Sequence, residues 1–376
     1  MRRIFLRLFI LFGIVFISLF SFPELLPSMK ETRVDNSPLV TQPIQTIPFD
    51  TILGQNLIVG IPGSSLDRSA YFTLSEIKPA GIVLYQRNFR NFQQFTQLIK
   101  ALQRVAVRTT GYPYYIMLDE EPEGANRTGL LKHVFISGNP NWKKMREDIQ
   151  QLARMGINVE LAPLADFPFV PNSFISKRIP FSKSENMRDF NHSFIQMLRQ
   201  YNIQATLKHF PGLGLLTDDP HYKVVSSNSE VSMIEKSMDL FHDGIKNGVG
   251  FVMSSHAFYK KIDPENLVTF SNRIIQQKLI NELGFKGIVI TDDLSDMPLT
   301  VSSFELSQSG IMALEAGHHL IMYSHQLNRT KRIFALLLQK ANQDPKFYSL
   351  LYHNYLKITE NKDSHLPIPT DEVPYE

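Results

Sequence analysis

The 376-residue chain is 43% hydrophobic, enough for a sizeable core and too much for an intrinsically disordered protein. Its acidic and basic residues are interspersed and leave a net charge of only +3, so we expect no nucleic acid partner. The absence of cysteine excludes disulfide bonds, thiolate metal sites, a cysteine nucleophile and a lipid-modified cysteine.

A basic and then apolar segment opens the sequence. Arg2, Arg3 and Arg7 precede an apolar run over residues 8–22, which is the pattern of an export signal. No small-residue cleavage motif follows, so we expect residues 1–22 to be either a signal peptide or a signal anchor. A buried core helix is the alternative, which the flanking arginines disfavour.

Residues 23–50 are rich in proline, serine and threonine and lack helical periodicity. We expect them to form a linker between the hydrophobic segment and the following domain. The domain is therefore expected outside the cytoplasm, either secreted or periplasmic, or tethered to the membrane through residues 1–22.

Short apolar runs alternate with longer amphipathic stretches from residue 51 onward. Eight of the runs fit buried parallel strands, at residues 57–61, 81–85, 114–118, 159–162, 205–208, 251–254, 287–290 and 320–323. This order predicts an α/β fold, a (β/α)8 TIM-type barrel over residues 51–362, with a polar tail at 363–376. An open doubly wound sheet is the alternative, but no Gly-x-Gly-x-x-Gly turn follows the first strand, so a dinucleotide site is not expected.

Helical periodicity separates most of the predicted strands. Apolar residues recur at helical spacing within residues 92–99, 149–155, 187–197 and 234–245, and these stripes are expected to face the core. Gly156 stands where a left-handed helix C-cap is expected. Ser182 and Glu185 have the spacing of a capping box ahead of the third stretch.

Ionisable residues follow three of the predicted strands. The three segments are Asp119-Glu120-Glu121, Lys208-His209 with a glycine-rich loop that contains Asp219 and His221, and Asp292-Asp293. Reactive groups in a parallel barrel lie where strands end and the loops to the helices begin. We therefore expect these side chains to converge on one rim and form a carbohydrate or small-molecule site.

The residue types at this rim suit glycoside chemistry. A carboxylate held at a strand end, such as Asp292, can attack an anomeric carbon. Asp292 or Asp293 could instead cap the next helix; we expect Asp292 to face the pocket and Asp293 to be structural. In Asp219-x-His221, a carboxylate can orient an imidazole that protonates a leaving group near neutral pH. A lone loop histidine is more often a solvated surface residue.

Four blocks of sequence occur in a characteristic order. They are residues 81–89, residues 205–214 followed by Asp219-Pro220-His221, residues 253–256, and residues 284–294. Together they resemble family 3 glycoside hydrolases, in particular the single-domain β-N-acetylglucosaminidases (β-hexosaminidases) that act on peptidoglycan fragments. The resemblance extends over most of residues 53–330.

The resemblance implies a retaining exo-β-glycosidase that removes terminal N-acetylglucosamine from peptidoglycan or related glycans. Asp292 would be the nucleophile, and His221, assisted by Asp219, would be the acid/base. The substrate-binding residues that it implies are Asp119, Arg127, Arg178, Lys208 and His209. A surface ion pair is the alternative for each arginine. No metal and no cofactor are expected, and the enzyme would act as a monomer.

Three departures from the family pattern leave alternatives open. The Gly-Gly pair usual after the strand-end aspartate is replaced by residues 120–124, Leu213 replaces a histidine, and Ile179-Pro180 follows Arg178 in place of a serine–aromatic pair. The alternatives are a β-glucosidase or an enzyme for another cell-wall sugar, a phosphorylase that uses phosphate in place of water, and a non-catalytic glycan-binding module.

Overall fold

The computed structural model describes residues 47–122, 124–136, 138–295 and 306–367. The predicted export segment, nearly all of the linker and most of the tail lie outside these ranges, so those predictions stay open. Helix α1 (Phe49–Gly54) and helix α10 (Pro345–His365) extend slightly beyond the predicted domain limits of 51 and 362. None of the helices in the described ranges is long and apolar enough to cross a membrane.

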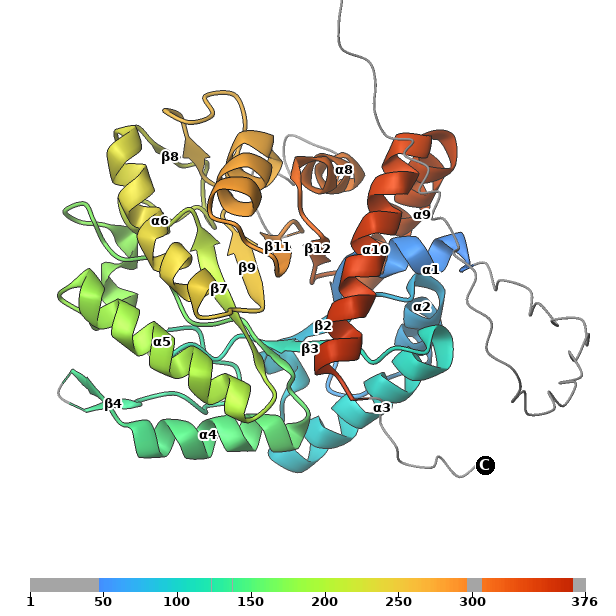
Figure 1. Ribbon diagram of the computed structural model, residues 1–376. Coiled ribbons are helices and arrows are strands. Elements are labelled where there is room, and N and C mark those ends of the chain that lie inside the picture. The colour runs from blue at the N-terminus through green and yellow to red at the C-terminus, as the bar shows by residue number, and fades with distance from the viewer. Residues whose placement is uncertain (1–46, 123, 137, 296–305, 368–376) are drawn as a thin grey trace, which may run out of the picture. The chain divides into compact units, whose positions relative to one another are not determined.

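Eight parallel strands close into a barrel, which confirms the predicted fold class (Figure 1). In chain order they are β1 (Leu57–Gly60), β2 (Gly81–Leu84), β3 (Tyr115–Leu118), β6 (Val159–Glu160), β7 (Gln204–Phe210), β9 (Phe251–Ser254), β11 (Ile288–Asp293) and β12 (Leu320–Tyr323). The first and last strands pair with each other and so close the barrel. Each strand overlaps the apolar run that predicted it, and β7 and β11 extend beyond theirs by two and three residues at the C-terminal end.

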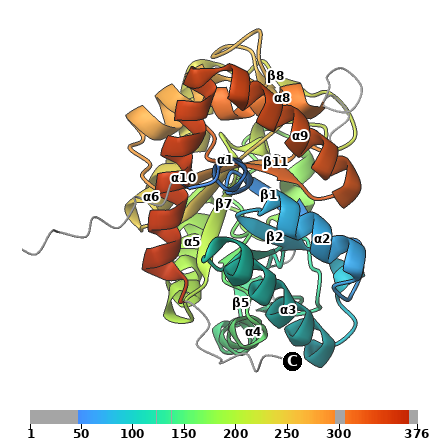
Figure 2. The same cartoon turned by 90° about the vertical axis from the view of Figure 1, so that its right-hand side faces the viewer.

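Helices surround the barrel on its outside (Figures 1 and 2). They include α2 (Arg68–Ile77), α3 (Phe92–Thr110), α4 (Trp142–Met155), α5 (Ser184–Gln200), α6 (Val231–Lys246), α8 (Leu306–Ala316), α9 (Leu327–Gln343) and the π-helix η5 (Arg273–Glu282). Gly156 ends α4 with φ of 97°, as predicted. The predicted capping box is wrong, because Lys183 is the N-cap of α5 and no side chain bonds to that helix end.

Two small sheets stand apart from the barrel. Strands β4 (Phe135–Ile136) and β5 (Asn139–Pro140) pair antiparallel in the loop after β3. Strands β8 (Ser226–Ser227) and β10 (Phe258–Tyr259) pair parallel and join the loops that follow β7 and β9. Both sheets lie in loops that leave the C-terminal ends of barrel strands, so they brace the rim where the site was expected.

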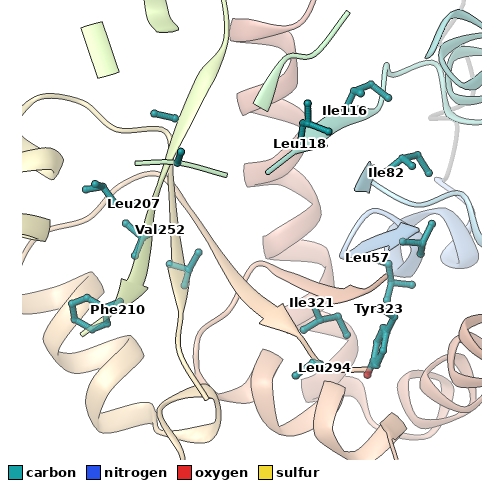
Figure 3. Close-up of a cluster of buried hydrophobic side chains, with 14 of the residues drawn as sticks. Leu57, Ile82, Ile116, Leu118, Leu207, Phe210, Val252, Leu294, Ile321 and Tyr323 are labelled. Carbon is teal, nitrogen blue, oxygen red and sulfur yellow. The ribbon is translucent and has the colours of Figure 1, made fainter. Parts of the chain in front are cut away.

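The core has two layers because side chains of a strand alternate between its two faces. Residues such as Leu57, Ile82 and Leu207 pack between the strands and the helices (Figure 3). The other face fills the barrel interior, and Ile358 of α10 packs there with Tyr115 from the start of β3. Helix α10 therefore closes the N-terminal end of the barrel, and the C-terminal end is left for a site.

Candidate active site

A pocket of about 450 Å³ opens at the C-terminal ends of the strands. Every predicted site residue except Asp219 lines it: Asp119, Arg127, Arg178, Lys208, His209, His221 and Asp292. Its remaining lining includes the apolar side chains of Val83, Leu161, Met253 and Met322, which come from barrel strands or the residue after one. The structure thus brings together residues that are far apart in the sequence.

Asp292 lies near the end of β11 with its side chain only 15% exposed. Its Oδ2 is 3.7 Å from Nε2 of His209 and 3.9 Å from Nε2 of His221. The backbone N–H of Asp293 donates to its Oδ1 at 2.8 Å. Burial alone would raise the pKa of Asp292, but the charges of nearby histidines, His209 and then His221 first, together with the N–H of Asp293 outweigh this and hold its pKa below the usual range. Asp292 is therefore an ionised carboxylate in the pocket wall.

Asp219 and His221 form a pair on the loop that follows β7. Asp219 Oδ1 lies 2.6 Å from the ring Nδ1 of His221 and accepts the backbone N–H of the same residue at 2.9 Å. This hydrogen bond raises the pKa of His221 against the opposing effect of burial. Asp219 holds the ring from outside the pocket, so the other nitrogen, Nε2, is presented to the interior.

Lys208 lies at the centre of a row of alternating charges along one wall, between an aspartate and a glutamate. Lys208 Nζ lies 2.5 Å from Asp119 Oδ1 and 2.7 Å from Glu121 Oε1. Arg127 bonds to the second oxygen of Asp119 at 2.6 Å, and Arg178 bonds to Glu121. Both arginines therefore face the pocket as part of this row. Hydroxyl and amide groups of a sugar could bind to either sign of charge here.

Glu121 belongs to a segment that was expected at the rim, but the sequence analysis gave this residue no role of its own. Its side chain is 1% exposed and bridges Lys208 and Arg178. Burial would raise its pKa, but these two cations hold it at about 2. A usable signal was present, since Glu121 lies only two residues beyond Asp119 after an apolar strand.

Asp166 is a second missed residue. Its carboxylate is buried; Oδ2 lies 2.8 Å from Nδ1 of His209, and Oδ1 accepts the backbone N–H of His209 at 3.0 Å. The rule applied to the other strand ends could have found it, because Asp166 follows the apolar run that contains β6.

Asp293 also lines the pocket, but both of its carboxylate oxygens bond to neighbouring groups of the protein. Its Oδ1 accepts the backbone N–H of Ser295 at 2.9 Å and the Ser295 hydroxyl at 2.6 Å, and its other oxygen bonds to the Ser324 hydroxyl. The hydroxyl of Tyr85 donates to Ser324 at 2.8 Å. Asp293 thereby ties the end of β11 to the end of β12 and fixes the strand that carries Asp292.

Across the described ranges, no group of three or more His, Asp or Glu side chains is arranged to hold a metal ion. The chemistry that these residues can perform themselves is that of a nucleophilic carboxylate beside an oriented imidazole.

Comparison with known proteins gives a consistent result. The model of the glycosyl hydrolase family 3 N-terminal domain matches residues 59–343. A β-hexosaminidase from Xanthomonas axonopodis pv. citri (strain 306) is 26% identical over 288 residues, which cover 72% of this chain and 83% of the relative. A β-hexosaminidase from Nitrosomonas eutropha is 26% identical over 282 residues, or 71% of this chain and 79% of the relative.

Solved structures share the fold. A family 3 β-N-acetylglucosaminidase from Paenibacillus sp. str. FPU-7 superposes with a TM-score of 0.75 at 24% identity, over 88% of this chain and 65% of that protein. A β-N-acetylhexosaminidase from Beutenbergia cavernae DSM 12333 gives a TM-score of 0.75 at 24% identity, over 84% of this chain and 99% of its own.

Proposed function

The chain belongs to glycosyl hydrolase family 3, since the family model matches most of its length, and we propose that it is a retaining exo-acting β-N-acetylglucosaminidase. The names of the β-hexosaminidase relatives support the choice of substrate class. The geometry around Asp292 supports the mechanism.

The observation that carries the proposal is the short distance between a carboxylate and an oriented imidazole. Asp292 Oδ2 and His221 Nε2 are 3.9 Å apart. Inverting glycosidases separate their two catalytic groups by roughly 6.5–9.5 Å to admit a water molecule, whereas retaining enzymes hold them at about 5 Å. The observed gap suits retention, and the loop of His221 would move outward slightly as a sugar enters.

The reaction would proceed in two displacements. Asp292 attacks the anomeric carbon while the protonated His221 donates its Nε2 hydrogen to the departing oxygen, which leaves a sugar bonded to Asp292 and a neutral imidazole. That imidazole then takes a proton from water as the water oxygen attacks the same carbon. The carboxylate is released, the sugar leaves with its β configuration, and His221 is protonated again.

The row of charges would bind the terminal sugar. Asp119, Lys208 and Arg178 present acceptors and donors along one wall, and the barrel strands close the pocket below them. A site closed on this side accepts one terminal residue, which favours exo cleavage. His209 lies between this wall and Asp292 and would bind a hydroxyl close to the reacting carbon.

The natural substrate would be peptidoglycan or a related glycan that carries N-acetylglucosamine. The export pattern in residues 1–22 supports this choice, because an exported enzyme meets the cell wall. Fractionation of cells that make the native protein tests the location: recovery in the soluble cytoplasmic fraction would contradict export.

Hydrolysis of aryl β-glycosides tests the activity directly. A panel with N-acetylglucosaminide, N-acetylgalactosaminide and glucoside is assayed with and without phosphate. We expect the N-acetylglucosaminide to react fastest and to release free sugar in both buffers. Sugar phosphate as the main product would instead indicate a phosphorylase, and no turnover of any member would contradict the proposal.

A further inference from the structure

Two carboxylate–imidazole pairs converge on Asp292. Nδ1 of His221 lies 2.6 Å from Asp219, and Nδ1 of His209 lies 2.8 Å from Asp166. The Nε2 atoms of the two rings lie 3.9 and 3.7 Å from the same oxygen, Oδ2 of Asp292. The first pair supplies the acid/base of the proposed reaction. The second has the same geometry, and its carboxylate, Asp166, has no role in that reaction.

The two pairs differ in exposure. The side chains of His221 and Asp219 are 39% and 32% exposed, whereas those of His209 and Asp166 are 5% and 0% exposed. A buried carboxylate is tolerated only where hydrogen bonds replace its hydration. Asp166 meets this condition, because its Oδ1 accepts the backbone N–H groups of His209 at 3.0 Å and Leu213 at 2.7 Å.

The contact with Asp166 also determines how His209 carries its hydrogen. An ionised carboxylate can only accept hydrogen bonds, so Nδ1 of His209 must be the donor. The backbone holds the partners in place, since the N–H of Ala165 donates to the carbonyl of Lys208 at 2.7 Å. The ring is thus fixed from behind, with its Nε2 edge toward Asp292. The Asp166 carboxylate also stabilises the positively charged form of the ring, and in that form Nε2 presents an N–H to the Asp292 anion.

We propose that Asp166 is a positioning residue for the nucleophile: it holds His209 through Nδ1 and so fixes the imidazole edge that keeps Asp292 ionised. This inference rests on the proposed function, in which an ionised Asp292 attacks the sugar. In agreement, burial raises the pKa of Asp292, and the charge of His209 is the largest of the influences that lower it.

Other titratable residues also face this carboxylate. They are His221 on the loop after β7, His256 after β9 and Asp293 on β11, whose backbone N–H donates to Asp292. His256 is buried, which lowers its pKa to about 4. It is therefore neutral when the enzyme would work near neutral pH. The two imidazoles with carboxylate partners remain as the groups that can stabilise the anion.

The Asp166→Asn variant tests the proposal. An asparagine oxygen can still accept the two backbone N–H groups, while its NH2 group would donate to Nδ1, so that Nδ1 could no longer carry a hydrogen and the ring would lose the positive charge that faces Asp292. We expect the acid limb of the kcat/KM profile to move to higher pH, with kcat/KM at pH 5 at least tenfold lower, and the alkaline limb to stay in place. Asp219→Asn is the matched control and should move the alkaline limb only.

A titration without substrate gives an independent readout. The carboxyl ¹³C resonance of Asp292, assigned with Asp292→Asn, is followed against pH in the wild-type protein and in Asp166→Asn. A higher pKa in the variant supports the proposal, and an unchanged pKa overturns it. If the wild type hydrolyses no glycoside yet the pKa rises in the variant, the proposed function fails and the positioning role stands.

A measurement on the wild type covers the case in which Asp166→Asn does not fold. The ¹⁵N shifts of His209 at neutral pH report which ring nitrogen carries hydrogen. A protonated Nδ1 supports the role of Asp166, and an unprotonated Nδ1 overturns it.

Discussion

His221 and Asp219 show how a single hydrogen bond adjusts a side chain for proton transfer. The hydrogen bond to the Asp219 carboxylate raises the pKa of His221. Burial lowers this pKa, and the charge of Asp292 raises it further. A histidine begins near pKa 6.5, so a rise shifts the ring toward the protonated form near neutral pH. The imidazole can therefore serve as an acid in the first step and, once deprotonated, as a base in the second.

Replacement of Asp219 by asparagine should remove this effect. The pKa of His221 falls toward its ordinary value, so the alkaline limb of kcat/KM, where the acid loses its proton, moves to lower pH. We expect kcat/KM at pH 8 to fall by up to about 30-fold, since roughly 3% of the rings stay protonated there at a pKa of 6.5. A full pH profile with an aryl N-acetylglucosaminide measures it, and an unmoved alkaline limb would argue against His221 as the acid.

Asp292→Ala should lower kcat/KM by at least about 10³-fold, because nothing replaces the attacking carboxylate. A small anion such as azide could enter the space left by the side chain and restore part of the rate, with an α-glycosyl azide as product. Asp218→Asn is the control, since Asp218 pairs with Lys223 on the surface. Near-native turnover by the alanine variant would remove the basis of the mechanism.

Glu121→Gln should weaken substrate binding. The variant leaves Lys208 and Arg178 without their shared anion, so both cations lose the position from which they would bind sugar. We expect KM to rise roughly tenfold or more, which corresponds to about 1.4 kcal/mol. Glu147→Gln, on the exposed face of α4, is the matched control and should leave KM unchanged.

Residues with a chemical signature at a strand end were predictable, whereas their supporting partners were harder to find. Asp119 directly follows β3, Lys208 and Asp292 lie toward the ends of β7 and β11, and all three meet in the pocket. Asp166 and Glu121 follow strands too, but their importance comes from contacts with His209, Lys208 and Arg178. Such contacts depend on how neighbouring strands are staggered in the barrel, which spacing along one chain does not give.

Strand β7 and its loop position most of the site. Lys208 and His209 lie on the strand, and the loop then passes close to the segment after β6 before it reaches Asp219 and His221. Gly214 marks the closest approach: its carbonyl accepts the N–H of Phe169 at 3.1 Å, and a Cβ at this position would lie 1.6 Å from the carbonyl oxygen of Phe167.

Gly214→Ala should therefore displace the loop that carries the acid/base. Because the clash is with backbone, the loop must shift as a whole, at a cost of about 1–3 kcal/mol in stability. We expect a lower melting temperature and a marked loss of kcat. Gly63→Ala is the control, since its Cβ would meet only a carbonyl oxygen at 4.0 Å. Equal behaviour of the two variants would show that the approach at Gly214 is unimportant.

The regular elements were easier to predict than the short ones. Eight apolar runs correctly located eight strands, because strands covered on both faces must be apolar throughout. The sheets β4–β5 and β8–β10 have two-residue strands, too short for any periodicity to appear. The capping box at Ser182 was wrong because α5 begins two residues later, at Ser184, beyond the reach of that side chain.

The two ends of the barrel have opposite characters. The C-terminal end holds the charged pocket, and α10 covers the N-terminal end with Ile358 and Lys362. Lys362 is fully buried; its Nζ donates to Gln55 Oε1 at 2.8 Å and lies 5.0 Å from the centre of the Tyr115 ring. Burial lowers the pKa of Lys362 well below its usual value.

This lysine should make stability depend on pH. A lysine that is neutral in the folded protein takes up a proton on unfolding, so stability falls as the pH drops below the unfolded pKa of about 10.4. Lys362→Met removes that proton uptake. We expect the variant to gain stability relative to the wild type as the pH falls: the difference in free energy of unfolding, variant minus wild type, should be larger at pH 6 than at pH 10. Urea denaturation at the two pH values measures it. Lys346→Met, on the exposed start of α10, should show no such trend.

The most direct test of the account is the capture of the glycosyl-enzyme. The protein is treated with a 5-fluoro derivative of an N-acetylglucosaminyl fluoride, which slows the second displacement, and is then digested and examined by mass spectrometry. We predict one added sugar on the peptide that contains Asp292, and none in Asp292→Ala. Turnover of the substrate with no adduct, or an adduct on another carboxylate, would contradict the assignment of Asp292 as the nucleophile.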